Sequence, residues 1–171
     1  MRPEFKWGLI MGASLCLWII AEYYFGLHTP HVNLGQYPGY LSNLVPVAGL
    51  FLLLREKQST AFNGHLDLSQ GLVAGLAASF IGALIVYGFM LAYNQWINPD
   101  WVDNALAVKV AALRAQGIDE IKIRGEITFF RHANGPFGML ASTLLTLTIT
   151  GGIISFFLTL LLRRQPRIRA V

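Results

Sequence analysis

Glu22 is the side chain whose chemistry stands out first in this sequence. It is the only charged residue in the run 7–27, which is otherwise apolar or weakly polar. A charged side chain is costly inside a bilayer, so an acid in such a run is a candidate for proton or cation coupling. Glu22 also lies near the end of the run beside Tyr23 and Tyr24, where it can reach the membrane interface as an anchor. The sequence leaves both interpretations open.

The histidines give only a weak signal for a metal site. His28 and His31 share one loop, and His132 could join them from the same side, whereas His65 lies in a different loop. Imidazole is a common metal ligand, but no acid stands at a fixed spacing from these residues. The single cysteine excludes an internal disulfide and any cysteine metal cluster. We therefore expect no metal and no cofactor.

The sequence contains none of the short motifs that position a reactive group. It has no Gly-x-Ser-x-Gly elbow, no phosphate-binding loop ending in Lys, and no His-Glu-x-x-His. Acid–base catalysis also requires titratable groups that converge, and the apolar segments contain almost none. We expect no catalytic residues and a protein that is not an enzyme.

Small residues recur at a helical spacing in two of the apolar runs. Inside a bilayer, helices associate where small side chains let their backbones approach. These residues therefore predict helix packing within one chain or between copies, and less readily the wall of a narrow permeation path. The candidate packing residues are Gly8 and Gly12 in one run, and Gly71, Gly75, Ser79 and Ala83 in another.

Hydroxyl side chains are unusually frequent in the run 137–162. They can bond back to carbonyls of their own helix, so a polar lining is possible but not required. The hydroxyl residues are Ser142, Thr143, Thr146, Thr148, Thr150, Ser155 and Thr159.

The tripeptide Asn98-Pro99-Asp100 predicts a corner in the chain. Proline cannot continue a helix and disfavours helical geometry in the residue before it. Asp100 is a residue type that caps helices, and an amphipathic pattern starts near Trp101. We expect Asp100 to cap that helix, and a structural corner in preference to a ligand site.

Composition defines the environment of these residues. Of the 171 residues only 13% are charged and 54% are hydrophobic, whereas soluble domains are nearer a quarter charged. The solvent is therefore expected to be lipid. Four apolar runs, 7–27, 38–54, 69–97 and 137–162, predict an all-α integral membrane four-helix bundle that forms a single domain over 1–171. The charged triplet 55–57 is expected to end the second run.

The region 98–135 is the only sizeable polar part. An amphipathic helix should begin near Trp101 and stop at Gly117. The stretch 119–131 alternates like a strand, but an isolated strand would lack a partner, so we favour a helix. This extracytoplasmic segment is expected to lie on the membrane or to bind a partner through Trp101, Leu106, Ile127, Phe129 and Phe130.

Positive charge predicts the orientation. Eight of the 13 basic residues fall on one side: Arg2, Lys6, Arg55, Lys57, Arg163, Arg164, Arg167 and Arg169. The region 98–135 instead balances its basic residues with acids. The positive-inside rule then places both termini in the cytoplasm. The net charge of +4 is a topology signal, the basic tail is a membrane anchor, and we expect no nucleic-acid partner.

Three stretches resemble a family of uncharacterised bacterial membrane proteins, DUF 4199 (domain of unknown function). They are Leu68-Ser69-Gln70-Gly71 before a Gly/Ala/Ser-rich run, Asn98-Pro99-Asp100-Trp101 after it, and Gln116-Gly117-Ile118-Asp119-Glu120 before the last run. The resemblance covers nearly the whole chain. It implies four spans and a place in the bacterial inner membrane, and it carries no established reaction.

The expected role is an accessory or assembly component that packs on itself or on another membrane protein through its small-residue faces. The alternative is a small oligomeric transporter or channel, with Glu22 and the hydroxyls of 137–162 along the path. A third possibility, an enzyme acting on lipid at the outer surface, would need His132 or the external acids to converge on a headgroup.

Overall fold

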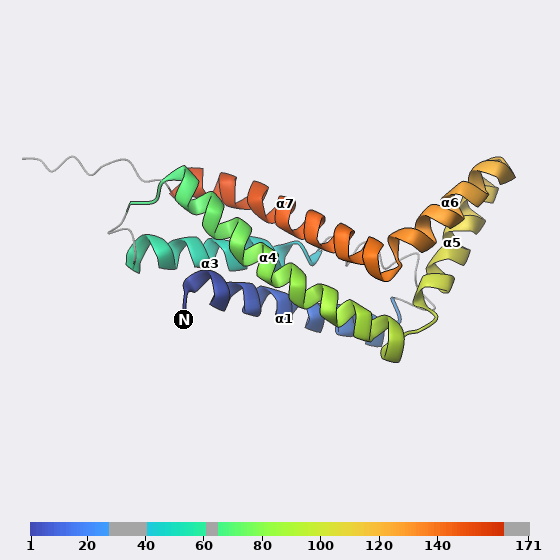
Figure 1. Ribbon diagram of the computed structural model, residues 1–171, viewed down its shortest axis with the longest axis horizontal. Helices are drawn as coiled ribbons and strands as arrows, with labels where there is room; N and C mark the ends of the chain where they lie inside the picture. The colour runs from blue at the N-terminus through green and yellow to red at the C-terminus, as the bar shows by residue number, and fades with distance from the viewer. Residues whose placement is uncertain (28–40, 61–64, 163–171) are drawn as a thin grey trace, which may run out of the picture.

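The computed structural model describes residues 1–27, 41–60 and 65–162, and every regular element in these residues is helical. The elements are α1 (Pro3–Tyr24), α3 (Leu44–Thr60), α4 (Leu68–Ala92), the π-helix η1 (Tyr93–Ile97), α5 (Trp101–Ala115), α6 (Glu120–Ala133) and α7 (Pro136–Leu162). The prediction of an all-α protein is confirmed (Figure 1). The stretch 119–131 is helical rather than extended, as the sequence favoured.

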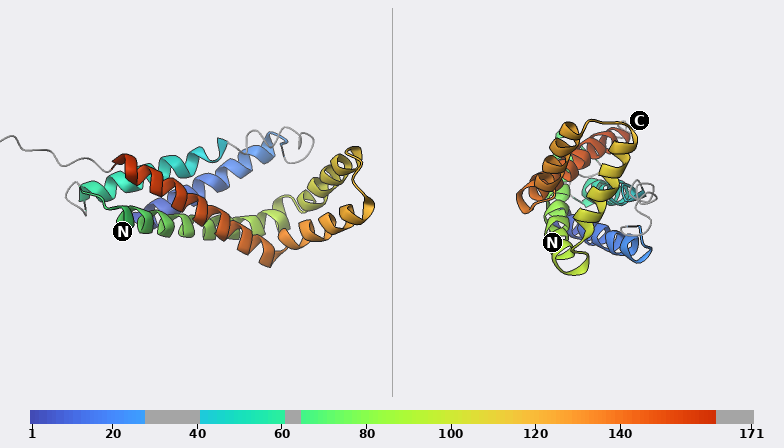
Figure 2. Two further views of the ribbon diagram at one scale, coloured as in Figure 1. Left: turned by 90° about the horizontal axis from the view of Figure 1, so that it is seen from above. Right: turned by 90° about the vertical axis from the view of Figure 1, so that its right-hand side faces the viewer.

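Helices α1, α3, α4 and α7 pack together as one bundle, and α5 and α6 form a hairpin that projects from one end of it (Figure 1). The left view in Figure 2 shows the hairpin extending beyond the bundle, and the right view looks along the bundle from the hairpin. We term this end of the bundle the hairpin end. The opposite end, where α1 begins and α7 finishes, is termed the terminal end.

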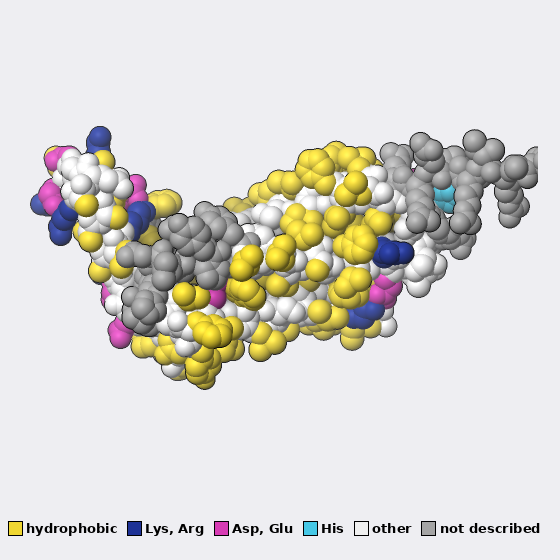
Figure 3. Space-filling model, turned by 180° about the vertical axis from the view of Figure 1, so that it is seen from behind, with side chains coloured by type: hydrophobic (Ala, Val, Ile, Leu, Met, Phe, Trp, Pro, Cys, Tyr) yellow, Lys and Arg dark blue, Asp and Glu magenta, His cyan; other side chains and the backbone are white. Residues whose placement is uncertain are grey.

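Within the described residues, three helices are long and apolar enough to cross a membrane: α1, the continuous pair α4–η1, and α7. Large apolar side chains on these helices face outward. Figure 3 shows them covering the middle of the bundle, with charged side chains gathered toward its two ends. Soluble proteins rarely expose an apolar surface this continuous, so the fold indicates a membrane protein.

Helix α3 does not end where the sequence suggested. The charged triplet 55–57 was expected to stop it sharply, but the helix continues to Thr60. Glu56 accepts hydrogen bonds from Lys6 and from Trp7 Nε1, the latter at 2.7 Å, so these charges are part of the packed helix. Pro46 is the third helical residue, where its missing N–H removes no helical bond and no kink is needed. The expected start of this helix near residue 37 lies outside the described residues.

The closest packing in the bundle is between α4 and α7, which run antiparallel. Gly71 faces Thr159, Gly75 faces Ser155, and Gly151 faces Ser79, so each glycine of one helix accommodates a hydroxyl side chain of the other. A side chain added at any of these glycines would overlap the residue opposite. The two backbones therefore approach closely because one partner at each step has no side chain.

Helix α1 also approaches α4 closely through glycines. A methyl group at Gly8 would collide with Ile81 and the backbone carbonyl of Ala78, and one at Gly12 with Ile85. Met11, between the two glycines in the sequence, is buried with Leu50 and other core residues. The bundle interior is thus filled by small and aliphatic side chains.

Candidate functional site

The side chain of Glu22 turns into the bundle at the hairpin end. It lies in the last turn of α1 and is only 9% exposed, and Trp18 Nε1 donates a hydrogen bond to its Oε1 at 2.7 Å. The sequence suggested that Glu22 reaches the interface beside Tyr23 and Tyr24. Of Glu22, Tyr23 and Tyr24, only Tyr24 is exposed. The helix ends just beyond, where Gly26 adopts a φ of +72° that a residue with a side chain rarely adopts.

Tyr93 is the centre of an aromatic and polar cluster at the same end. Its side chain is fully buried, and its ring packs edge-on against that of Tyr23, with centroids 5.9 Å apart. The phenolic oxygen accepts a hydrogen bond from Asn98 Nδ2 at 3.1 Å, which joins the start of η1 to the corner that follows it. A π-helical turn contains one residue more than an α-turn and is often found at functional sites.

The corner itself is formed by backbone geometry rather than by the side chain of Asp100. Asn98 has a φ of −140°, as the following Pro99 favours, and its buried side chain is held by Tyr93. Asp100 occupies the cap position of α5, but the prediction that its side chain caps the helix was wrong. With φ −87° and ψ 1°, Asp100 is not in the extended conformation from which a cap side chain reaches the first helical amides. Its backbone carbonyl accepts from Asn104 instead.

Glu22 and Tyr93 are the polar groups of this cluster. Glu22 accepts a hydrogen bond from the indole of Trp18, and the Tyr93 hydroxyl accepts one from the carboxamide of Asn98. Among the described residues no group of three or more His, Cys, Asp or Glu could hold a metal ion. His132 lies with Nδ1 3.0 Å from the Thr128 carbonyl of its own helix. His28 and His31 lie outside the described residues.

A family model described as "Protein of unknown function (DUF4199)" matches residues 6–164. The chain belongs to the DUF4199 family. The resemblance read from the sequence motifs is therefore confirmed over nearly the whole chain. No curated protein and no solved structure matches it. Because the DUF4199 family carries no assigned reaction, no catalytic role transfers to any residue of this member.

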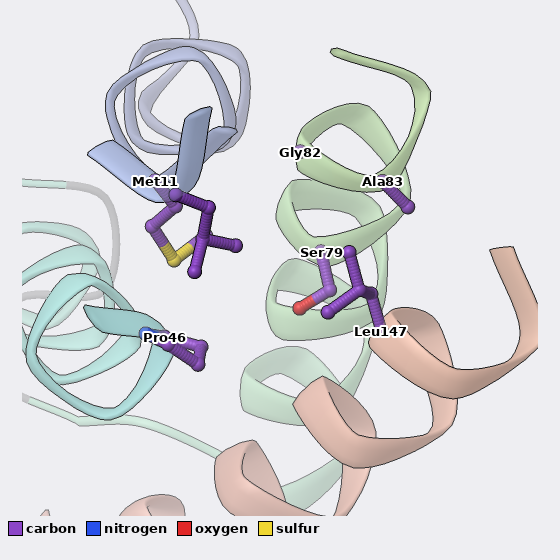
Figure 4. A pocket seen from close by; sticks show the side chains of 7 residues that line it. Met11, Pro46, Ser79, Gly82, Ala83 and Leu147 are labelled. Atoms are coloured by element: carbon purple, nitrogen blue, oxygen red, sulfur yellow. The ribbon is translucent and has the colours of Figure 1, made fainter. Parts of the chain in front are cut away.

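A small cavity lies at the centre of this DUF4199 bundle, between α1, α3, α4 and α7 (Figure 4). Met11, Pro46, Ser79 and Leu147 point toward it, and its volume of about 20 Å³ leaves room for about one water molecule. The small residues at positions 8, 12, 71, 75, 79 and 83 lie on the packed faces of α1 and α4, and all six are buried. They are therefore used inside the chain and do not offer a free face to a partner.

Three of the seven hydroxyl residues of α7 bond to their own helix or pack in the α4 contact. Thr159 Oγ1 donates to the Ser155 carbonyl at 2.6 Å, and Ser142 Oγ donates to the Met139 carbonyl at 3.2 Å. Ser155 and Thr159 are fully buried against α4. Ser155 and Thr159 therefore line a contact between helices rather than an open path.

Sequence reasoning missed Trp18 and Tyr93. The four-residue spacing of Trp18 and Glu22 on one helix face could have suggested their hydrogen bond. Nothing in the local sequence indicates the π-turn at Tyr93 or its bond to Asn98.

Proposed function

We propose that this protein is a non-enzymatic accessory component of the bacterial inner membrane. In this proposal it crosses the bilayer four times with both termini in the cytoplasm, and its α5–α6 hairpin binds another membrane protein on the opposite side. The bundle anchors the hairpin and fixes its direction.

The packing of α3 supports a fourth crossing. It contacts α1, α4 and α7, and its charged end meets the first turns of α1 through Glu56 and Lys57. At roughly 1.5 Å per residue its 17 residues extend about 25 Å, with the apolar part, 44–54, beside the candidate spans and the charged part at the terminal end. Helices α1 and α7 then begin and end on the same side, which agrees with an even number of crossings.

The distribution of charge supports the orientation. Arg2, Lys6, Arg55 and Lys57 all belong to the terminal end of the bundle. The hairpin carries five basic residues, against eight in the terminal segments and the stretch 55–57. The positive-inside rule assigns the side with the excess of Lys and Arg to the cytoplasm.

The observation that carries the partner proposal is the uncharged outer face of α5. Apart from Asn104, it presents small apolar side chains at helical spacing, and its residues are all exposed: Asn104, Ala107, Val108, Ala111, Ala112 and Ala115. Short side chains allow a second helix to approach closely without displacing bulky groups. The small-residue faces of the bundle, which the sequence suggested for this role, are occupied by neighbouring helices.

Quantitative co-purification in mild detergent tests this proposal. The wild-type chain is compared with Ala111→Glu, which puts a charge into the outer face of α5, and with Thr128→Glu, which puts the same charge on the far side of the hairpin. We expect Ala111→Glu to lose a protein that wild type and Thr128→Glu retain. A wild-type chain recovered as a monodisperse monomer with no associated protein, or a partner retained equally by all three chains, would contradict it.

The burial of Glu22 favours a second candidate, a small transporter or channel assembled from several copies. A cavity of about 20 Å³ cannot pass a solute, so the path would have to lie between chains. Replacing Glu22 with Gln should then abolish a proton- or ion-dependent flux in proteoliposomes. The accessory proposal expects no such flux from either chain.

A further inference from the structure

The side of α6 that faces away from α5 carries exposed apolar side chains. Ile121 is 79% exposed and Phe129 is 69% exposed, whereas Ile123, on the other side of the helix, is fully buried. The spacing of four, seven, eight and eleven residues from Ile121 puts one row of side chains on the exposed side. We term this row the outward face of α6: Ile121, Gly125, Thr128, Phe129 and His132.

Positive charge exceeds negative charge around the outward face. The acids of α6 are bound by α5, because Glu120 pairs with Arg114 and Glu126 pairs with Lys109. Lys122 and Arg124 lie on either side of the outward face and take part in none of the ion pairs found in the described residues. This side of the hairpin therefore presents two cations around apolar side chains.

The position of α6 in the chain indicates what lies against its outward face. It ends at Ala133, and α7, which is long and apolar enough to cross a membrane, begins at Pro136. The junction must then lie near the level at which α7 enters the bilayer. Phe137, the first side chain after it, is 88% exposed.

A shallow open groove lies at this junction. Its lining includes Arg131 and His132 of α6 and Phe137 of α7, and its volume is about 280 Å³, compared with about 20 Å³ for the cavity in the bundle. His132 belongs both to the groove and to the outward face. The groove therefore connects the outward face of α6 to the start of α7.

We propose that the outward face of α6 docks on the headgroup layer of the membrane that α7 enters. In this arrangement the hairpin leans toward the membrane from the projecting direction seen in Figure 1, so that Phe129 and Ile121 insert among the lipids and Lys122 and Arg124 bind the phosphates of anionic phospholipids. Apolar side chains flanked by cations are the combination by which helices bind an anionic membrane surface. Continuity with α7 favours a bilayer over a protein as the occupant. The inference does not depend on the proposed protein partner, which uses α5.

Spin labels on the two sides of the hairpin test the docking. In a chain whose one cysteine is removed by Cys16→Ser, a label is placed by Thr128→Cys on the outward face or by Ala111→Cys on α5. Each chain is put in nanodiscs of phosphatidylcholine with phosphatidylglycerol. We expect the ratio of oxygen to nickel-chelate accessibility to be several-fold higher at Thr128 than at Ala111. The ratio at Thr128 should fall toward that at Ala111 in pure phosphatidylcholine and in the double variant Lys122→Gln/Arg124→Gln.

Three results would overturn the proposal. Equal ratios at the two positions in the anionic nanodiscs would mean that the outward face lies in water. Protection of the Thr128 label from both reagents would mean that protein covers the face, and spin–spin broadening between labels would identify that protein as a second copy. A Thr128 ratio that is insensitive to lipid charge and to the double variant would remove the role of the two cations. The mobility of the Ala111 label in each chain shows whether the hairpin is still folded.

Discussion

Two pairs of antiparallel helices, α4 with α7 and α5 with α6, are held together by different kinds of interaction. In the bundle, glycines face hydroxyl side chains, and no ion pair joins α4 to α7 in the described residues. In the hairpin, Leu106 and Ile123 are the buried side chains and three ion pairs connect the helices or their connecting turn. The difference follows from the solvent on each side.

Lipid tails are as apolar as leucine, so burying a leucine between two helices in a bilayer gains little, and close contact between backbones must supply the attraction. In water, burial of apolar surface is favourable, so a few buried side chains can stabilise a hairpin outside the bilayer. The bundle should therefore be sensitive to added volume and the hairpin to removed volume.

The largest effect should come from a bulky residue at Gly75. Even a Cβ atom at this position would overlap Ser155, and the rest of a Gly75→Leu side chain would have to displace α7. We expect a loss of stability above about 4 kcal/mol, the range of sterically incompatible core substitutions, and no monodisperse protein in detergent. Gly88→Leu is the matched control in the same helix, because no atom lies within 4 Å of a Cβ at Gly88. Equal yields of the two variants would refute the close-packed contact.

Removing volume from the hairpin should have the next largest effect. Ile123→Ala deletes a fully buried side chain and should destabilise the hairpin by about 2–4 kcal/mol. Hydrogen exchange should show faster opening of α5 and α6 while α4 and α7 stay protected. Ile121→Ala, at an exposed position of the same helix, should change stability in detergent by less than about 0.5 kcal/mol. Faster exchange throughout the bundle would show that the two regions are not independent.

Two glycines of the hairpin should respond to alanine with opposite signs. Gly125 lies inside α6 with open space around it, so Gly125→Ala should stabilise the helix by about 0.5–1 kcal/mol. Gly117 has a φ of +71° at the end of α5, where alanine is strained by about 1–2 kcal/mol. Protection of the hairpin amides should rise in the first variant and fall in the second. A change of the same sign in both would mean that backbone conformation does not limit hairpin stability.

The smallest effect should be the pH dependence of the hairpin turn. Hydrogen bonds from Arg114 lower the pKa of Glu120 below its ordinary value of 4.5. A lowered pKa in the folded state means that the pair stabilises the hairpin above about pH 4.5 and that this stabilisation is lost as the pH falls through the folded pKa. An NMR titration of the Glu120 carboxyl group should give a higher pKa in Arg114→Gln. An unchanged value would show that the pair does not form in solution.

The sequence predicts those features that depend on local pattern. Uncharged runs locate α4 and α7, Gly117 stops α5 in the positive-φ conformation that glycine allows, and Pro99 forces the corner after η1. The helical state of 119–131 also follows, because a lone strand has no partner there.

Features that depend on distant partners could not be predicted in the same way. Arg55-Glu56-Lys57 looked like the end of a helix because nothing nearby indicates that Lys6 and Glu4 will pair with Glu56 and Lys57. Leu106 was expected at the membrane or on a partner, but it is buried in the hairpin, since α6 packs on the apolar side of α5. For the candidate site, the sequence indicates Glu22 and the corner, whereas the positions of Trp18 and Tyr93 depend on how the helices meet.

The π-turn of η1 has a consequence for the direction of the hairpin. An α-helix rotates by about 100° per residue, whereas a π-turn uses one residue more for nearly the same full turn. If one residue between Tyr93 and Ile97 were deleted and an α-turn formed, the corner would therefore keep nearly the same direction around the axis of α4. If all five residues were wound as an α-helix instead, the arm beyond them would rotate by about 100°. The wide turn thus lets the helix carry one more amino acid without re-aiming the hairpin.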